Sequence, residues 1–409
     1  MIENNKVVIT GMGAVTSLGD DLQTTWDNIL EGKSGIGYVT LFDTTNSGTK
    51  IGAQVQDTFE EQAKKVIKRR DRKKMTRVTR MAMVAANEAI IDSKIDFSKV
   101  DSLRVAVIMG VVTSAYNDKE REDSKQNIIV KSMPNAPSAW ISIYNNIKGP
   151  NFSVSAACAS SAYAITLGKK LIESGLYDIV ITGGTDSHIN KECYEGFNQI
   201  MAMSTNNQEP EIACRPFSKD RDGFIMGEGA GILVLESEKH ALERNAKIYA
   251  EVSGTSITSD ADDITAPSQD GLGMFMSMDI AVKDSKVPLS RIGYVNAHGT
   301  STYLNDKYET IAIKKLFGDR AKEILVSSTK SMIGHTIGAS GVIEGIVTVK
   351  SLIEGVIPPT INYQNPDEEL DLNYVPNNLI IREVEAAISN SFGFGGHNAS
   401  IVFNKYNNK

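Results

Sequence analysis

Two distant segments of the sequence follow the same order of structural elements. Residues 152–183 predict a strand, a turn of small residues and a helix that ends in KLIESG. Residues 324–355 predict a strand, a loop and a helix that ends in KSLIEG. Strands that alternate with helices at this rhythm are typical of an α/β fold.

This repetition indicates a duplicated chain with a divide near residue 250. At 409 residues, the chain is too long for one small hydrophobic core. We therefore expect an N-terminal half over residues 1–250, which carries Cys158, and a C-terminal half over residues 251–409, which carries His298 and His335.

The composition is that of an ordinary globular protein, with 41% hydrophobic and 23% charged residues. A net charge of −7 disfavours nucleic acid as a partner. Without a signal-peptide pattern or a long apolar run, we expect a cytoplasmic protein that does not act at a membrane. The three cysteines, Cys158, Cys193 and Cys214, lack metal-ligand spacing, so neither a metal site nor a disulfide framework is predicted.

The sequence around Cys158 predicts a cysteine at the start of a helix. The apolar run Phe152–Val154 is read as a strand, and the small residues after Cys158 begin a helix that continues through Ile172. Unpaired N–H groups and the positive end of the helix dipole favour a thiolate at such a position. The alternative is a buried structural cysteine, the commoner role of a lone cysteine.

Two of the five histidines follow predicted strands in the same way. His298 comes just after strand 292–295, and His335 comes soon after strand 324–327, whereas His188, His240 and His397 lack this placement. In open α/β sheets, sites form outside the carboxyl ends of strands. A cysteine with two histidines predicts covalent acyl transfer, in which a thioester forms and imidazoles stabilise charge at a carbonyl. No G-x-S-x-G motif supports a serine hydrolase.

Glycine-rich stretches are predicted to end or precede strands. The strand Val7–Thr10 is expected to stop at a turn over residues 11–13, which is a better reading than a dinucleotide fingerprint. The strand 179–182 is likewise expected to end in two glycines, and residues 222–231 to lead into strand 232–236. Helices are expected over residues 75–91 and 239–246, a strand over 248–253, and a polar surface excursion with some helix over 114–131.

A basic run lies between Lys64 and Arg80, where ten of seventeen residues are Lys or Arg and only Asp71 is acidic. One interpretation is a solvated helical face. The other is a docking patch for an acidic partner, whose approach the positive charge would steer.

Taken together, these motifs resemble the β-ketoacyl-acyl-carrier-protein synthases, the thiolase-fold condensing enzymes, of the elongating Cys-His-His class. The matching stretches are 8–13, the Cys158 turn, 215–217, 221–236, 296–309, 327–344 and 389–398. The resemblance implies a thiolase-like fold with a duplicated five-layer αβαβα architecture. It also implies an acyltransferase that condenses a Cys-bound acyl group with malonyl-carrier protein, with loss of carbon dioxide, in fatty-acid or type II polyketide biosynthesis.

The resemblance further implies roles for individual residues. Cys158 would accept the acyl chain, and its backbone N–H would form an oxyanion hole with that of Phe394. His298 and His335 would donate hydrogen bonds to the malonyl thioester oxygen. Lys330 and Glu344 would orient the site, and Asp306 and Glu309 would brace the His298 loop. The pantetheine tunnel would be lined by Thr265, Thr300 and Thr302. Phe394 resembles the gate of the acyl pocket.

The same resemblance implies an acidic acyl carrier protein as partner, with substrates held on its phosphopantetheine and no other cofactor. It favours a docking role for part of the run 64–77, with these candidates: Lys64, Lys65, Lys68, Arg69, Arg72 and Lys73. A dimer is expected, either with a second copy or with a chain-length-factor-like subunit.

Three departures from the family pattern bear on the substrate. Asp263 stands where many fatty-acid members have His, Tyr303 replaces the usual Pro, and the excursion 111–131 is short and polar. They suggest a specialised type II polyketide or aryl-polyene synthase. Two alternatives remain, a catalytic subunit active only as a heterodimer and a non-catalytic subunit that shapes the tunnel. A degradative thiolase would need a second cysteine within 391–398, and none is present.

Overall fold

The computed structural model describes residues 5–113 and 128–407. Ten strands of this part form one curved mixed sheet in the order β10-β9-β13-β14-β8-β1-β7-β6-β4-β5. The N-terminal strands are β1 (Val7–Val15), β4 (Val105–Gly110), β5 (Asn151–Val154), β6 (Ile179–Ser187) and β7 (Glu228–Ser237). The C-terminal strands are β8 (Ala250–Ser259), β9 (Ile292–Asn296), β10 (Leu325–Ser327), β13 (Ala386–Gly393) and β14 (His397–Lys405).

Both halves of the sheet have the same topology. Numbered along the chain within each half, the strands lie in the order first, fifth, fourth, second, third. The halves join where β1 pairs with β8 through only two residue pairs, Val8 with Glu251 and Ile9 with Ala250. The fold is therefore a duplicated α/β unit whose two half-sheets meet along one short edge.

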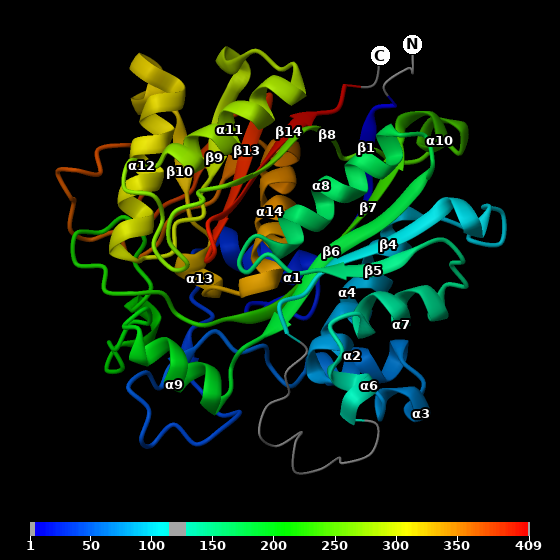
Figure 1. Ribbon diagram of the computed structural model, residues 1–409, viewed down its shortest axis with the longest axis horizontal. Helices are drawn as coiled ribbons and strands as arrows, with labels where there is room; N and C mark the ends of the chain where they lie inside the picture. The colour runs from blue at the N-terminus through cyan, green and yellow to red at the C-terminus, as the bar shows by residue number, and fades with distance from the viewer. Residues whose placement is uncertain (1–4, 114–127, 408–409) are drawn as a thin grey trace.

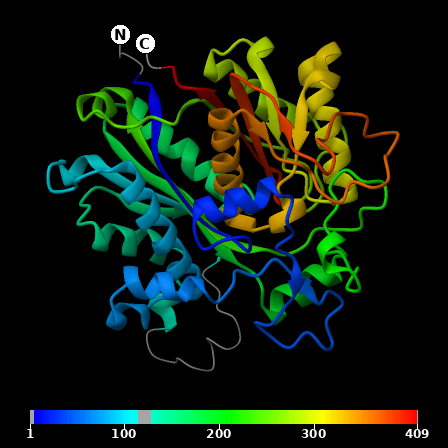
Figure 2. The same ribbon diagram turned by 180° about the vertical axis from the view of Figure 1, so that it is seen from behind.

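Helices fill the space between the half-sheets and cover their outer faces (Figures 1 and 2). Helices α8 (Ser160–Glu173) and α14 (Ser340–Glu354) form the central layer and contact strands of both halves. Helix α4 (Arg77–Ser93) covers β1 and β7, and α11 (Leu272–Ser285) with α12 (Tyr303–Phe317) covers the opposite face. The layers thus run helix, sheet, helix, sheet, helix.

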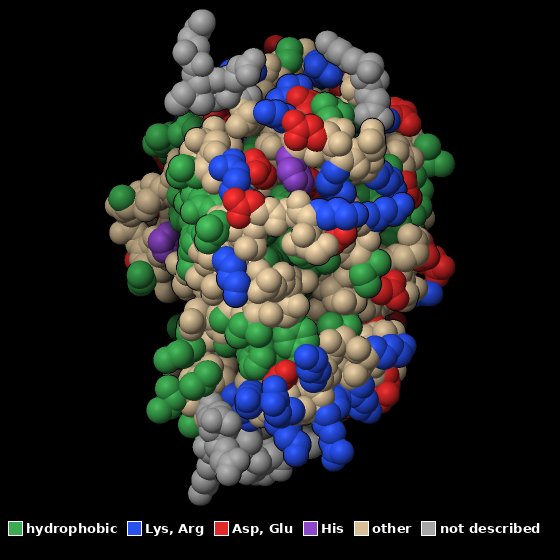
Figure 3. Space-filling model, turned by 90° about the vertical axis from the view of Figure 1, so that its right-hand side faces the viewer, with side chains coloured by type: hydrophobic (Ala, Val, Ile, Leu, Met, Phe, Trp, Pro, Cys, Tyr) green, Lys and Arg blue, Asp and Glu red, His purple; other side chains and the backbone are tan. Residues whose placement is uncertain are grey.

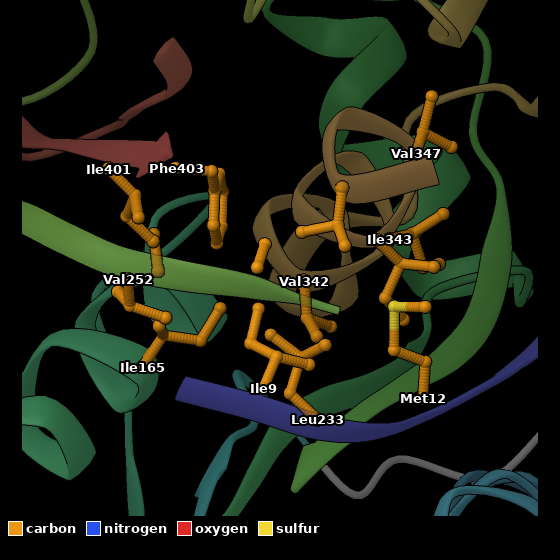
Figure 4. Packing of buried hydrophobic residues seen from close by; sticks show 14 of the residues in the cluster. Ile9, Met12, Ile165, Leu233, Val252, Val342, Ile343, Val347, Ile401 and Phe403 are labelled. Atoms are coloured by element: carbon orange, nitrogen blue, oxygen red, sulfur yellow. The ribbon is translucent and has the colours of Figure 1, made fainter. Parts of the chain in front are cut away.

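The main hydrophobic core lies in the central layer, where side chains from both halves meet (Figure 4). The labelled members come from β1, β7, β8, β14, α8 and α14: Ile9, Met12, Leu233, Val252, Ile401, Phe403, Ile165, Val342, Ile343 and Val347. Each apolar side chain of this size contributes ~1.5–3 kcal/mol when it is buried. This shared core holds the strand ends of the two halves in a fixed relation.

The turn predicted at residues 11–13 is wrong, because β1 continues through these glycines to Val15. A Cβ at Gly11 or Gly13 would overlap the carbonyl oxygens of Ala89 or Ala85 on α4. The two glycines therefore serve the close packing of α4 on the strand, not a reversal of the chain.

The glycines expected to flank strands 179–182 and 232–236 also lie inside strands. Gly183 and Gly184 are part of β6, which continues to Ser187, and Gly229 and Gly231 are part of β7. A Cβ at Gly183 would overlap the backbone of Gly231 on the neighbouring strand. Glycine here permits close contact between backbones.

Smaller differences concern the element boundaries. The helix expected over 75–91 is α4, and α10 (Glu238–Glu243) is shorter than expected, while β8 begins at Ala250. Of the excursion 114–131, residues 114–127 lie outside the described residues. The remaining elements are α1 (Leu22–Leu30), β2 (Gly37–Tyr38), β3 (Ile51–Gly52), α2 (Phe59–Val66), α3 (Arg69–Arg72), α6 (Ile128–Ser132), α7 (Ala136–Tyr144), α9 (Lys191–Gln199), α13 (Lys330–Ile333), β11 (Val356–Ile357) and β12 (Ile380–Ile381). Within the described ranges, no helix has the length and apolar character to cross a bilayer.

Candidate active site

Cys158 lies in a sharp turn between β5 and α8. Ala157 has a positive φ of 46°, unusual for a residue with a side chain. The Ser160 hydroxyl braces the turn, since it accepts the N–H of Ala156 at 2.8 Å and donates to the carbonyl of Ala157 at 2.7 Å. Gly393 lies so close that a Cβ there would be 3.0 Å from the Cys158 nitrogen. The turn is thus held from both sides.

Burial of Cys158 opposes the thiolate that the start of a helix favours. Burial raises the pKa of Cys158 to about 11, although the positive charge of Lys330 and the backbone N–H groups of Phe394 and Cys158 act in the opposite direction. The helix begins at Ser160. Desolvation of the thiol outweighs the stabilisation that the helix N-terminus would give to a thiolate. Cys158 therefore rests as a neutral thiol with two amides directed at its sulfur.

The structure brings Cys158, His298 and His335 together. Their sulfur and ring nitrogen atoms all lie within 4.8 Å of one another. The two imidazoles are buried and meet edge to face, with centroids 5.3 Å apart and an angle of 82° between the rings. His298 follows β9, and His335 follows the short helix α13 after β10. Three chain segments from both halves therefore converge on one point.

His335 is held in one tautomer. The backbone N–H of Ile337 donates to Nδ1 at 3.3 Å, and the Ser340 hydroxyl contacts the same atom at 2.9 Å. An amide can only donate, so Nδ1 accepts and the proton of the neutral ring is on Nε2. Phe224 packs edge to face against this ring at 5.5 Å between centroids.

His298 reaches the same state through Lys330. Lys330 Nζ lies 3.3 Å from His298 Nδ1, donates to the His298 carbonyl at 2.6 Å and forms an ion pair with Glu344. Burial, and then the positive charge of Lys330, holds the pKa of both His298 and His335 well below the usual range. Both rings are therefore neutral and present an Nε2–H donor.

Buried carboxylates brace the surrounding loops. Glu309 accepts the N–H groups of His298 at 2.9 Å and Gly299 at 2.8 Å. Asp306 accepts the N–H of Phe217 at 2.8 Å and lies 3.7 Å from Arg221. These carboxylates belong to α12 and are buried away from water, so they hold the loop after β9 against this helix.

Glu344 is the third buried carboxylate, and it faces Lys330 from the central helix α14. Burial raises its pKa to about 7, while Lys330 acts in the opposite direction. A carboxyl group that titrates near neutrality therefore pairs with the Lys330 ammonium.

A cavity of about 610 Å³ opens onto the three reactive groups. Thr265, Thr300, Thr302 and Phe394, all singled out in the sequence, line this cavity. The hydroxyls of Thr300 and Thr302 lie 2.8 Å apart. Phe394 is 37% exposed and follows β13 at its carboxyl end.

The cavity wall also contains residues that the sequence analysis missed: Phe197, Phe224, Phe392, Ile337 and His188. The sequence predicts that the strand before His188 ends at Gly183 and Gly184, so that His188 does not directly follow it. Since β6 continues to Ser187, His188 does follow a strand end. The missed signal was the length of this strand beyond its two glycines.

Cysteine and histidine are also zinc ligands, and the geometry of this group would admit a small ion. The surrounding charge disfavours one, because the Lys330 ammonium lies 3.3 Å from His298 Nδ1. The residues therefore fit a site that stabilises negative charge better than one that holds a cation.

The basic run forms an exposed patch on α2, α3 and the loop to α4 (Figure 3). Of the candidate docking residues, Arg72 is half-buried. The other five are exposed: Lys64, Lys65, Lys68, Arg69 and Lys73. Arg77, within the range expected to dock a partner, is instead buried, and its Nη2 lies 2.7 Å from Glu228 Oε1. Asp71 is also buried and accepts a hydrogen bond from the Tyr144 hydroxyl at 3.0 Å.

Comparison with known protein families gives matches over most of the chain. Residues 4–241 match the family described as Beta-ketoacyl synthase, N-terminal domain. Residues 249–364 match the family described as Beta-ketoacyl synthase, C-terminal domain.

Individual proteins match over the whole length. A protein of Synechocystis sp. named 3-oxoacyl-[acyl-carrier-protein] synthase 2 is 42% identical, with 99% of each chain covered. The structure of the ishigamide ketosynthase/chain length factor has a TM-score of 0.90 at 31% identity, covering 99% of this chain and 100% of that one. A type II PKS acyl-carrier protein in complex with its ketosynthase bound to the hexaketide has a TM-score of 0.87 at 28% identity, with the same coverage.

Proposed function

The chain belongs to the β-ketoacyl synthase family, and from this membership we infer that Cys158, His298 and His335 form its reaction centre. It has the thiolase-like fold and is a condensing acyltransferase, a β-ketoacyl-acyl-carrier-protein synthase. The predicted family, fold class and reaction are confirmed. The roles of single residues are our proposal, and they are supported by the geometry of the site.

In the first half-reaction, the Cys158 sulfur attacks the thioester carbonyl of an acyl-carrier protein. The thiol proton passes through solvent in the cavity to the departing sulfur, because both Nε2 atoms already carry a proton and a pKa of about 11 leaves little thiolate at neutral pH. The oxyanion of the tetrahedral intermediate is held by the N–H groups of Cys158 and Phe394. The carrier-protein thiolate then leaves and takes up the proton, and the acyl group remains on Cys158.

In the second half-reaction, malonyl-carrier protein binds and its carboxylate leaves as carbon dioxide. The electron pair of the broken bond forms an enolate, whose oxygen accepts hydrogen bonds from Nε2–H of His298 and His335. The enolate carbon attacks the acyl carbonyl on Cys158, so that a carbon–carbon bond forms and the carbon–sulfur bond breaks. Cys158 leaves as thiolate and regains a proton from solvent.

The observation that carries this proposal is the shared tautomer of the two histidines. Ile337 and Lys330 each donate to an Nδ1 atom, which leaves two Nε2–H donors beside the cysteine sulfur. Two neutral donors in a buried cavity stabilise a developing oxyanion without taking a full proton.

The substrates are proposed to arrive on the phosphopantetheine of an acyl carrier protein. Thr265, Thr300 and Thr302 offer hydroxyls to the pantetheine arm, and Phe394 controls entry to the acyl pocket. The basic patch is suited to an acidic carrier protein. Its candidate docking residues are the exposed Lys64, Lys65, Lys68, Arg69 and Lys73 and the half-buried Arg72. The proposal is supported by the solved relative in complex with an acyl-carrier protein.

A dimer is proposed to form along β5, one of the two edge strands of the sheet. Phe152 on this strand and Ile143 on the adjacent α7 are exposed. One solved relative is a ketosynthase/chain length factor pair, so the partner is either a second copy or such a subunit. Co-purification followed by mass determination distinguishes the two.

The division of the chain into halves at residues 250 and 251 is also a proposal, supported by the start of β8 at Ala250.

The second candidate function is a non-catalytic subunit that only shapes the tunnel. The complete cysteine and histidine set favours the enzyme. The deciding experiment incubates wild type and Cys158→Ala with acyl- and malonyl-carrier protein. Wild type should give an acyl-enzyme mass adduct and a β-ketoacyl product, and Cys158→Ala should give neither. Absence of both from wild type, alone and with its partner, would leave only the tunnel-shaping role.

A further inference from the structure

A buried histidine that the condensation does not use lies in the cavity wall. His188 follows β6 and lines the same cavity as Cys158. Its side chain is only 6% exposed. Across residues 5–113 and 128–407, neither of its ring nitrogens makes a hydrogen bond. Nδ1 is the fully buried nitrogen of the two, and Nε2 is free to pair with a group that enters the cavity.

Asp186 determines which nitrogen of His188 is available. Asp186 Oδ1 lies 3.3 Å from His188 Nδ1. The carboxylate is fixed by the N–H groups of Val112 and Gly338, each at 3.1 Å, and of Ser187 at 3.2 Å. A proton on Nδ1 is attracted to this carboxylate, whereas a lone pair would be repelled. Nδ1 therefore carries the proton, and Nε2 is left as a hydrogen-bond acceptor.

The position of Asp186 is built into the packing around it. A Cβ on residue 338 would clash with the Asp186 carboxylate, so that only glycine leaves room for the amide to reach it. Nδ1 of His188 is enclosed by protein. The ring therefore meets the cavity through the side that carries Nε2.

His188 interacts electrostatically with His335, and several apolar side chains line the same cavity. Val112, Phe197, Phe224 and Ile337 line the cavity on this side of Cys158. A saturated acyl chain would contact these side chains well but would leave Nε2 without a partner. A site built with one buried polar atom discriminates strongly against ligands that cannot pair with it.

We propose that His188 selects acyl groups that carry a hydroxyl, which donates a hydrogen bond to Nε2, over saturated acyl groups of the same length. The inference rests on the proposed function, because the acyl group must reach Cys158 to occupy this cavity. His188 determines specificity and takes no part in the bond changes at the reacting carbonyl.

The test measures acylation of Cys158 by intact mass, with a saturated medium-length acyl-carrier protein and its hydroxyl positional isomers as donors. At least one isomer should acylate wild type about tenfold faster than the saturated chain, as one added hydrogen bond allows. His188→Phe keeps a ring but removes the acceptor, and it should abolish this preference. Phe197→Leu, which alters the cavity without touching the acceptor, should retain it.

Two outcomes overturn the inference while the proposed function stands. One is rapid acylation of wild type by the saturated chain with no isomer faster. The other is a preference that persists in His188→Phe. If that variant does not fold, the wild-type series alone decides. Failure of every donor to acylate Cys158, together with the absence of condensation product, would overturn the inference and the proposed function together.

Discussion

Lys330 Nζ lies 3.3 Å from Nδ1 of His298 and 2.6 Å from the carbonyl oxygen of the same residue. An ammonium group can only donate, so the contact makes Nδ1 an acceptor and leaves the ring proton on Nε2. The positive charge also helps to keep the pKa of His298 below its usual range. One side chain thus fixes the orientation, the tautomer and the charge of the histidine.

Replacement of Lys330 by Met should remove all three effects. We expect the rate of malonyl decarboxylation to fall about 10–100-fold, as for other groups that orient a reacting residue. With one depressing charge gone, the pKa of His298 should rise, so that the acid limb of the pH–rate profile moves to higher pH. NMR titration of the histidines checks the shift directly. Glu344→Gln, which retains Lys330, is the control and should not raise the pKa of His298.

His335 should act mainly in the second half-reaction. In His335→Ala, loss of one enolate donor should slow decarboxylation about 10²–10³-fold. Acylation of Cys158 should change much less, because its oxyanion is held by backbone N–H groups. Release of labelled carbon dioxide and the rate of acyl-enzyme formation measure the two steps separately. Equal losses in both would show that His335 serves the first half-reaction as well.

Much of the α/β order could be predicted from the sequence, because strand and helix periodicities are local. The roles of glycines could not, since Gly13 and Gly183 are explained by backbones that approach from elsewhere in the chain. A glycine in an apolar run has the same sequence signal whether it turns the chain or permits close packing.

The functional site, like the fold, could be predicted only in part from the sequence. Cys158, His298 and His335 could be selected because each follows a predicted strand, and the family resemblance supplied their supporting residues. The thiol pKa could not be predicted, because burial depends on the whole cavity. His188 was missed with the end of β6, and the burial of Arg77 depends on Glu228, which is distant in sequence.

The close packing of α4 on β1 predicts the effect of a single methyl group. In Gly13→Ala, the new Cβ would overlap the Ala85 carbonyl oxygen, and the helix must shift away from the strand. We expect a loss of ~1–3 kcal/mol in the free energy of unfolding, measured by denaturant titration. Gly196→Ala is the matched control, because no atom lies within 4 Å of the added Cβ. Equal stability of the two variants would contradict the packing role.

The raised pKa of Cys158 predicts how alkylation depends on pH. Only the thiolate reacts with iodoacetamide, and below a pKa of about 11 its fraction rises tenfold for each pH unit. The alkylation rate of wild type should therefore still be increasing at mildly alkaline pH. Cys158→Ala corrects for reaction at Cys193 and Cys214. A rate that reaches a plateau near neutral pH would show that the thiolate is already the resting form.

The exposed basic patch predicts a defect confined to carrier-protein substrates. In the double variant Lys68→Glu with Arg69→Glu, two exposed positive charges become negative, so an acidic carrier protein should be repelled. We expect KM for malonyl-carrier protein to rise about tenfold at low ionic strength, and the difference should shrink as salt is added. The value of kcat should change little, because α3 does not line the cavity of the reaction centre.

Two controls separate docking from a general effect of charge. Lys239→Glu alters an exposed lysine on α10, outside the patch, and should leave KM unchanged. A malonyl-pantetheine substrate lacks the carrier protein, so the double variant and wild type should use it equally well. If KM for the carrier protein is unchanged in the double variant, Lys68 and Arg69 take no part in docking, and the partner must approach the cavity over another surface.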